Sequence, residues 1–111
     1  MSSVHYTALR SAWDRMNAQK IVDEIIPNCS SFKIGKTGDI LYKRLNNYDG
    51  EYDHIKLVFA GEKLKVDNME SYLIDKYIDY PKCDNKKDGS ASNKDTMAEN
   101  AELYQVYIVW K

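Results

Sequence analysis

Residues 32–38 read Phe32-Lys33-Ile34-Gly35-Lys36-Thr37-Gly38, and the chain continues directly as Asp39-Ile40-Leu41-Tyr42-Lys43-Arg44-Leu45. The first segment predicts a short apolar strand that stops at a glycine, and the second predicts a helix that begins almost at once. Backbone N–H groups, lysine side chains and a guanidinium would then converge on one anion. The segment therefore predicts a phosphate-binding arrangement built by Gly35, Lys36 and Arg44.

The size and composition of the chain predict one small globular domain. The chain has 111 residues, of which 43% are hydrophobic and 30% are charged, and this suffices for a modest core. It has no apolar run long enough to span a membrane and no leader-like start, so we expect a cytoplasmic protein without a membrane partner. Cys29 and Cys83 lie far apart in unlike contexts, which favours reduced thiols over a disulfide or a zinc site.

Charge is unevenly distributed along the chain. The formal net charge is only −1, but basic residues gather around the first segment, namely Lys33, Lys36, Lys43 and Arg44. Acidic residues dominate elsewhere, so the chain lacks the broad positive field of a protein that coats nucleic acid. Any binding of nucleic acid should therefore be local, and weak unless a partner helps.

Hydrophobic periodicity predicts an α+β fold with a small three-stranded sheet flanked by helices. Before Pro27 the apolar stripe changes side, which indicates two helical pieces with a break near Asn17. Asp67 or Asn68 is expected to cap a later helix. The expected ranges are strands at 31–36, 55–60 and 103–110, helices at 39–47 and 69–80, and a polar loop at 82–94.

The last of these strands is apolar at nearly every position from Leu103 to Trp110. An edge strand would alternate, whereas a continuous β-branched and aromatic run is typical of a strand covered on both faces. We therefore expect the C-terminal strand to be central, antiparallel to two outer strands that are parallel to each other. The expected organisation is an N-terminal helical segment (1–30) followed by a core domain (31–111).

The run Lys33-Ile34-Gly35-Lys36-Thr37, with Arg44 on the next helix, resembles the second motif of the GIY-YIG endonuclease superfamily, in the variant with Lys at the first position of the YIG triplet. The family's first motif is an early strand, and no such strand is expected before Phe32. Val106-Tyr107-Ile108-Val109 is similar to that first motif. The resemblance thus covers about residues 32–111 and implies a circularly permuted GIY-YIG-like core.

The resemblance implies catalytic roles for three residues. Tyr107 matches the tyrosine of the first motif and would act as general base or position the attacking water. Arg44 matches the helical arginine that stabilises charge on the scissile phosphate, a task suited to its permanent charge and planar donor fork. Glu70 would hold a single Mg²⁺ or Mn²⁺ ion through one carboxylate.

Three further residues have counterparts in the family, and two of them, Lys33 and Tyr48, are also expected to be catalytic. Lys33 stands in the place of the tyrosine of the second motif. Tyr48 stands where family members often carry another tyrosine or a histidine, and Asn85 resembles the late asparagine. If these residues form one site with Tyr107 and Glu70, their side chains should open onto one concave face.

Two functions follow from these residues. The first is a metal-dependent nuclease that hydrolyses phosphodiester bonds of nucleic acid, with DNA favoured over RNA. The second is a catalytically inactive GIY-YIG-like binding or inhibitor protein that acts through protein or nucleic-acid contacts. Tyr107, Arg44 and Glu70 favour the first function, whereas Lys33 in place of a tyrosine, the near-neutral charge and the small size favour the second.

Structural interpretations of the same residues stay open beside the functional ones. A tyrosine in a central strand is commonly a core residue, and an acidic residue in the first turn of a helix stabilises the helix dipole. The N-terminal helices carry two apolar stripes that point in different directions. One stripe is expected to pack on the sheet and the other on a protein partner or a second copy of the chain.

Overall fold

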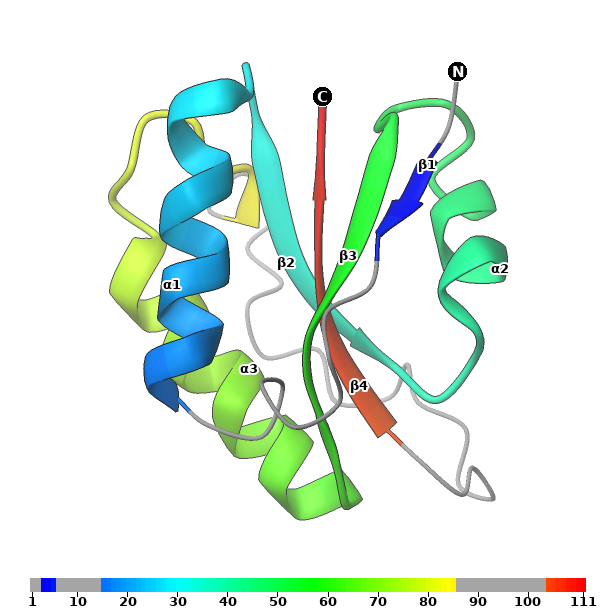
Figure 1. Cartoon of the computed structure of the whole chain (residues 1–111), viewed down its shortest axis with the longest axis vertical. Coiled ribbons are helices and arrows are strands. Elements are labelled where there is room, and N and C mark those ends of the chain that lie inside the picture. The colour runs from blue at the N-terminus through cyan, green and yellow to red at the C-terminus, as the bar shows by residue number, and fades with distance from the viewer. Residues whose placement is uncertain (1–2, 6–14, 86–103) are drawn as a thin grey trace.

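The computed structural model describes residues 3–5, 15–85 and 104–111. Its elements in chain order are β1 (Ser3–His5), α1 (Arg15–Ile25), the 3-10 turn η2 (Ile26–Asn28), β2 (Phe32–Thr37), α2 (Leu41–Asn46), β3 (His54–Gly61), α3 (Lys63–Tyr77) and β4 (Tyr104–Trp110). They form an α+β fold in which α1 and α3 lie on one side of the sheet and α2 lies on the other (Figure 1). Within the described ranges, no helix has the length and apolar character needed to cross a membrane.

The C-terminal strand is internal to the sheet, as the sequence predicted. The strand order is β1-β3-β4-β2, and β4 runs antiparallel to both β2 and β3. The two outer partners of β4 are therefore parallel to each other. In this register Gly35 of β2 lies directly opposite Tyr107 of β4, which places the two predicted motif strands side by side.

The sheet has four strands, so the prediction of three was wrong. Ser3–His5 pairs in parallel with β3 from His54 to Lys56, and the Ser3 N–H donates to the Asp53 carbonyl at 2.7 Å. A segment of three residues is too short to show the alternation that identifies a strand. The segment 1–30, predicted to be helical, therefore also contributes a strand to the sheet.

Helix α1 runs without interruption through Asn17, so the predicted break is absent. Ala18 is buried and continues the apolar face of the helix, whereas Met16 is 78% exposed. Because Ala18 lies one turn before Ile21 and Val22, one buried stripe serves the whole helix. The other residues of the first predicted stripe lie outside the described ranges, and a contact with a partner or second copy stays a prediction.

Helix α3 begins at Lys63 and ends at Tyr77, earlier at both ends than the predicted 69–80. Asp67 and Asn68 are therefore inside the helix and do not cap it. The first turn was missed because Leu64 is 70% exposed, so the apolar stripe becomes regular only after it. This earlier start places Asp67 one turn before Glu70, on a helix that faces β2.

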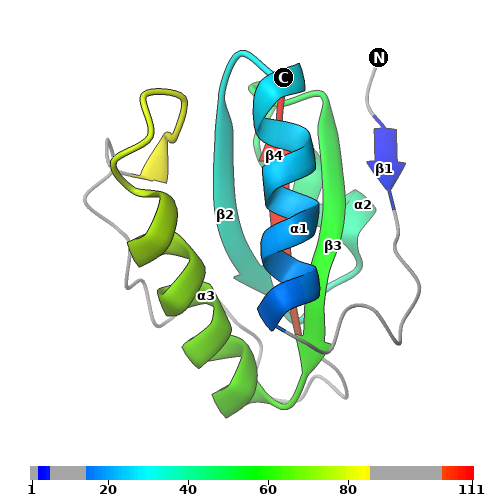
Figure 2. The same cartoon turned by 60° about the vertical axis from the view of Figure 1, so that its left-hand side comes forward.

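Two clusters of buried side chains cover the two faces of the sheet. The cluster beneath α1 and α3 joins residues of both helices to residues of β2, β3 and β4, and Figure 2 shows α1 lying across the sheet on that side. The cluster beneath α2 contains Leu41, Leu45, Ile55, Tyr107 and Val109 among others. Because α1 is part of the first cluster, the N-terminal segment and the predicted core domain share one interior.

The chain after α3 returns to cover the outer edge of β2. The Phe32 N–H donates to the Lys82 carbonyl at 2.9 Å, and the Asp84 N–H donates to the Phe32 carbonyl at 2.8 Å. Residues 82–85 therefore behave as a short partner of an edge strand, while the rest of the predicted loop lies outside the described ranges. Cys83 in this segment and Cys29 are both buried, free cysteines.

Candidate functional site

A cavity of about 110 Å³ lies at β2, the edge strand of the sheet. Side chains from β2, α2, α3, β4 and the segment after α3 surround it. Every site residue predicted from the sequence lines this cavity, whose wall consists of Lys33, Ile34, Gly35, Lys36, Arg44, Tyr48, Glu70, Ile74, Asn85 and Tyr107.

The cavity reaches both sides of the sheet because β2 has no neighbouring strand beyond it. Side chains alternate along β2, so Lys33 and Gly35 face α2 whereas Lys36 faces α3. Tyr107 belongs to the cluster beneath α2, and Glu70 comes from α3. The predicted site residues therefore share one cavity, as expected, but Tyr107 and Glu70 reach it from opposite faces of the sheet.

The α2 side of the cavity contains three side chains joined by hydrogen bonds. The Nε–H of Arg44 donates to the Tyr107 hydroxyl oxygen at 2.9 Å, and the hydroxyls of Tyr48 and Tyr107 are 2.5 Å apart. The Arg44 guanidinium carbon lies 5.8 Å from the centroid of each tyrosine ring. Gly35 provides the space for this group, since a Cβ at that position would overlap the Tyr107 hydroxyl.

Electrostatics fix the protonation of two members of this group. Burial, followed by the contact with Tyr107, raises the pKa of Tyr48 well above its ordinary value, so Tyr48 remains a hydroxyl donor. Desolvation opposes the charge of Arg44, but its contacts with Tyr107 and Tyr48 raise the guanidinium pKa overall. A permanent cation therefore lies within hydrogen-bond distance of the Tyr107 hydroxyl oxygen.

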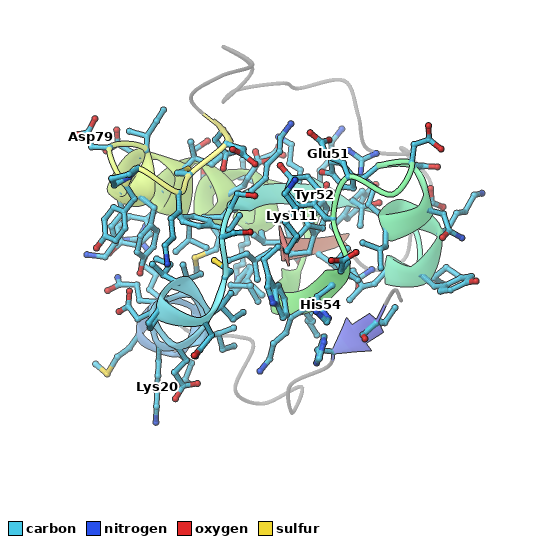
Figure 3. The ribbon with its side chains drawn as sticks, turned by 90° about the horizontal axis from the view of Figure 1, so that it is seen from above. Lys20, Glu51, Tyr52, His54, Asp79 and Lys111 are labelled. Carbon is cyan, nitrogen blue, oxygen red and sulfur yellow. The ribbon has the colours of Figure 1, made fainter. Side chains whose placement is uncertain are left out.

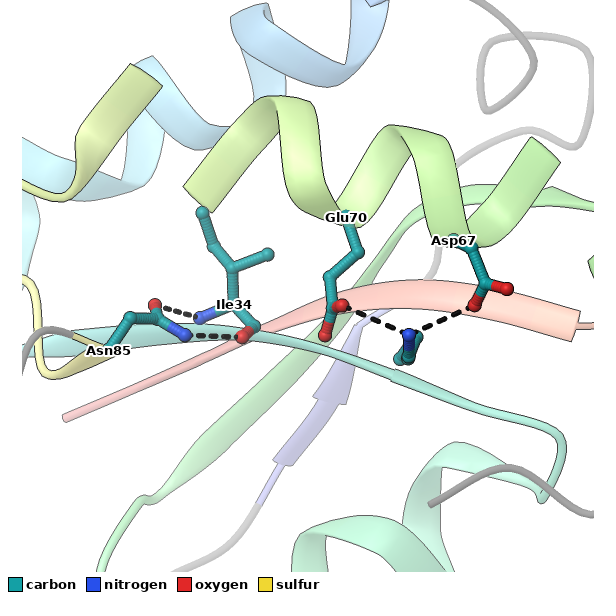
Figure 4. A network of polar contacts seen from close by, with 5 residues as sticks. Ile34, Asp67, Glu70 and Asn85 are labelled. Carbon is teal, nitrogen blue, oxygen red and sulfur yellow. Dashed lines mark hydrogen bonds and ion pairs between the residues drawn. The ribbon is translucent and has the colours of Figure 1, made fainter. Parts of the chain in front are cut away.

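On the α3 side, a lysine of the cavity wall lies between two carboxylates, of which Glu70 lines the cavity and Asp67 lies outside its wall (Figure 4). The Lys36 ammonium lies 2.9 Å from Asp67 Oδ1 and 3.4 Å from Glu70 Oε1. Desolvation would lower the pKa of Lys36, but the two carboxylates together raise it, so the lysine stays charged. Its ammonium is engaged here, and the predicted contact of Lys36 with phosphate would have to compete with both carboxylates.

Glu70 is the carboxylate most affected by burial. It is 7% exposed, and among the described residues its Oε1 atom has no hydrogen-bond partner. Burial raises the pKa of Glu70 to about 7, with Lys36 opposing the shift. A buried acceptor of this kind, facing a cavity, is suited to contact a cation.

The donor set fits a divalent ion only in part. Glu70 offers a buried oxygen, but the ammonium of Lys36 already lies against that oxygen. In the described part of the chain, no group of three or more His, Cys, Asp or Glu side chains could hold a metal ion. An ion at Glu70 would take its other ligands from water and from substrate phosphate, as Mg²⁺ commonly does.

Asn85 and Lys33 occupy supporting positions at the cavity. The Asn85 amide accepts from the Ile34 N–H at 2.9 Å and donates to the Ile34 carbonyl at 2.8 Å (Figure 4). It thus holds β2 in place beside the cavity. Lys33 has its ammonium 5.9 Å from the centroid of the Tyr48 ring, within reach of an anion bound near Arg44.

Lys33 also lines a second cavity, of about 330 Å³, at the end of the sheet where β4 finishes. Figure 3 shows Glu51, Tyr52 and Lys111 gathered at that end of the molecule. The wall is formed by Ser30, Ser31, Lys33, Glu51, Tyr52, Asp84 and Lys111. The two lysines and two acidic residues of this wall balance in charge. The wall of the first cavity, by contrast, carries an excess of positive charge.

The sequence predicted that backbone N–H groups at the start of the helix would help to bind an anion, and the structure does not show this arrangement. Helix α2 begins at Leu41, and no residue between Thr37 and Lys43 lines the first cavity. Arg44, one turn later, is the part of α2 that faces it. Side chains, and not backbone N–H groups of the helix start, therefore provide the positive charge of the site.

Asp67 is the residue of this site that sequence reasoning missed. It had been assigned as a helix cap, although its spacing of three from Glu70 would place both carboxylates on one helical face. The fold and its cavity define an α+β protein with a charged site at the edge strand of a mixed sheet. Comparison of the chain with protein-family models, curated proteins and solved structures gave no match.

Proposed function

We propose that this protein is a metal-dependent nuclease that hydrolyses phosphodiester bonds of nucleic acid, with a circularly permuted GIY-YIG-like core. The observation that carries the proposal is the hydrogen-bonded group of Tyr107, Arg44 and Tyr48 at the wall of the cavity. These are the residues that the family resemblance selected from distant parts of the sequence. Their convergence gives a hydroxyl, a fixed cation and a second donor at one place.

Tyr107 and Arg44 would share the work of the reaction. Tyr107 would accept the proton of the attacking water, or hold that water in line, because its hydroxyl lies at the cavity wall and is fixed there by the hydrogen bond from Arg44. Arg44 uses Nε for Tyr107, and the remaining N–H groups of its fork suit a phosphate oxygen. Lys33 would add positive charge on the same side of β2.

Glu70 is the residue that would hold Mg²⁺ or Mn²⁺ in this proposal. When bound, such an ion supplies Lewis-acid stabilisation of phosphate oxygens. The protein's own contribution is a buried oxygen that faces the cavity. Asn85 contributes by fixing the strand that separates Glu70 from Tyr107.

A second candidate function is a catalytically inactive protein of the same fold that binds nucleic acid or inhibits a protein. Two observations favour it: Lys33 replaces a tyrosine of the family motif, and the Lys36 ammonium lies against Glu70. For either function we propose a cytoplasmic protein, with DNA favoured over RNA as the nucleic acid.

Incubation of the pure protein with plasmid DNA and with RNA, each with Mg²⁺ or Mn²⁺, tests the proposal. We expect the unchanged protein to nick or cut the nucleic acid. Arg44→Ala should lower the cleavage rate by about 10²- to 10³-fold, as for loss of one transition-state donor, and Glu70→Ala should abolish cleavage. Lys43→Ala is the matched control, because Lys43 is an exposed neighbour that does not line the cavity.

The outcomes separate the two functions. Cleavage that persists in Arg44→Ala would exclude the proposed site. Nucleic-acid binding that depends on Arg44, without cleavage under any metal condition, would favour the inactive binding protein. Circular dichroism of each variant shows whether a loss reflects the site or the fold.

A further inference from the structure

Lys36 is a buried cation on an edge strand, and its surroundings are unusual for a lysine. It is 5% exposed, and its ammonium contacts two carboxylates that lie one turn apart on α3. Lysines are seldom buried to this degree unless they are paired. The geometry thus gives Lys36 a specific task toward Asp67 and Glu70.

The position of the ammonium is also the position that a metal ion would need. Glu70 Oε1 is buried, lacks a hydrogen bond within the described chain and lies at the cavity. A buried carboxylate requires a counter-charge because removal from water disfavours its ionised form. Lys36 supplies that charge from 3.4 Å, and its own charge would repel a second cation at the same oxygen.

The two contacts of Lys36 are unequal. The ammonium donates a hydrogen bond to Asp67 Oδ1 at 2.9 Å, whereas the contact with Glu70 is the longer ion pair. The Asp67 side chain is 37% exposed, so its charge is partly solvated as well. A lysine has a flexible stem, and Lys36 can therefore release Glu70 while it remains bonded to Asp67.

We propose that Lys36 is the resident cation at Glu70 and controls the entry of a divalent ion there. In the unliganded protein the ammonium neutralises Glu70, and an ion binds only when Lys36 withdraws to Asp67. This inference rests on the proposed function, in which Glu70 is the ion ligand. It adds that the site excludes free metal until the negative charge of substrate phosphate draws the second cation in.

Binding of Mn²⁺ without nucleic acid tests this role, measured by titration calorimetry and by the electron paramagnetic resonance signal of free Mn²⁺. We expect Lys36→Met to bind Mn²⁺ about tenfold more tightly or better than the unchanged protein when both are measured at about pH 8.5, where the Glu70 carboxyl can ionise without its counter-charge, because a like charge has been removed from the site. Adding Glu70→Gln to that variant should remove the gain. Lys65→Met is the matched control: it makes the same charge change at an exposed position of α3.

Thermal unfolding keeps the test decisive if Lys36→Met lowers stability by leaving Glu70 without its counter-charge. Mn²⁺ should then raise the unfolding midpoint of Lys36→Met more than that of the unchanged protein, because a ligand that binds only the folded state stabilises it. Equal Mn²⁺ affinity in the two proteins, or a variant that Mn²⁺ does not stabilise, would overturn the role of Lys36.

The nuclease proposal can fail separately. Tighter Mn²⁺ binding by Lys36→Met in a protein that never cleaves nucleic acid would support the role of Lys36 and reject the nuclease proposal. Cleavage that depends on Arg44, without any effect of Lys36→Met on Mn²⁺ binding, would do the reverse.

Discussion

Tyr107 belongs to the core and to the site at once. Its ring is completely buried in the cluster beneath α2, and its hydroxyl oxygen receives the Arg44 hydrogen bond. Both are possible because the opposite residue on β2 is a glycine. The need for glycine at position 35 is therefore a matter of space for a neighbour's hydroxyl, and not of backbone conformation.

Gly35→Ala should damage stability and function together. A methyl group there would overlap the Tyr107 hydroxyl, and forcing extra volume into a packed interior typically costs about 1–3 kcal/mol. Urea unfolding and the cleavage assay measure the two effects. Gly61→Ala is the matched control, since its Cβ would meet the Phe59 ring at an ordinary 3.6 Å; equal effects of both substitutions would contradict the steric argument.

The resemblance singled out Arg44 and Tyr107 from their neighbours in the sequence, and the structure brings these two side chains together at the cavity. The contacts of Lys36 with Asp67 and Glu70 were not predictable in the same way. Its position in the motif suggested phosphate, but alternation along β2 turns it toward α3, where its partners come from a helix whose start the sequence concealed. Asp67 was missed for that reason: a cap and a second-turn residue look alike until the helix boundary is known.

Strand β1 is attached to the sheet by a short pairing and a cluster of aromatic rings. His5 Nε2 and His54 Nδ1 lie 3.2 Å apart, and both imidazoles contact the Trp110 ring, with centroid distances of 5.1 and 5.0 Å. Desolvation, then the charges of His54 and Lys56, lower the pKa of His5 below its ordinary 6.5. The folded arrangement thus favours a neutral His5.

Attachment of β1 should weaken in mild acid. Because the folded-state pKa of His5 is lowered, its contribution to stability is complete above the ordinary value of 6.5 and is lost as the pH falls below it. Hydrogen exchange of the β1 and β3 amides at about pH 8 and about pH 5 measures this, since histidine titrates between them. His5→Asn should reduce the loss of amide protection between the two pH values. An unchanged loss of protection in that variant would assign the effect to another group.

β4 and β1 show which elements a sequence reveals. The continuous apolar run of β4 identifies a strand covered on both faces, and the structure places it inside the sheet. β1 has three residues, and its pairing depends on contacts with His54 and Trp110 that are remote in sequence. A strand such as β1, whose stabilising contacts are remote in sequence, has little hydrophobic pattern of its own. A strand such as β4, which forms much of the core, has a strong hydrophobic pattern.

The central position of β4 makes the whole molecule depend on it. Deleting residues 103–111 would leave β2 and β3 without their shared partner and expose both rows of ladder groups. We expect the shortened chain to lose cooperative thermal unfolding, followed by circular dichroism. Sedimentation reports whether it aggregates, and a truncated monomer that still melts in a single transition would show that β4 is dispensable.

The chain order of the strands has a consequence for biosynthesis. β4 follows β2 and β3 in the sequence but separates them in the sheet, so a ribosome delivers both neighbours of β4 before the strand that joins them. During that interval each presents an unsatisfied edge, which is the kind of surface that pairs wrongly with other nascent chains. Folding must then wait for contacts such as Gly35 with Tyr107, and contacts so remote in sequence form slowly. Exposure of these two strand edges during translation is the vulnerability that this topology creates.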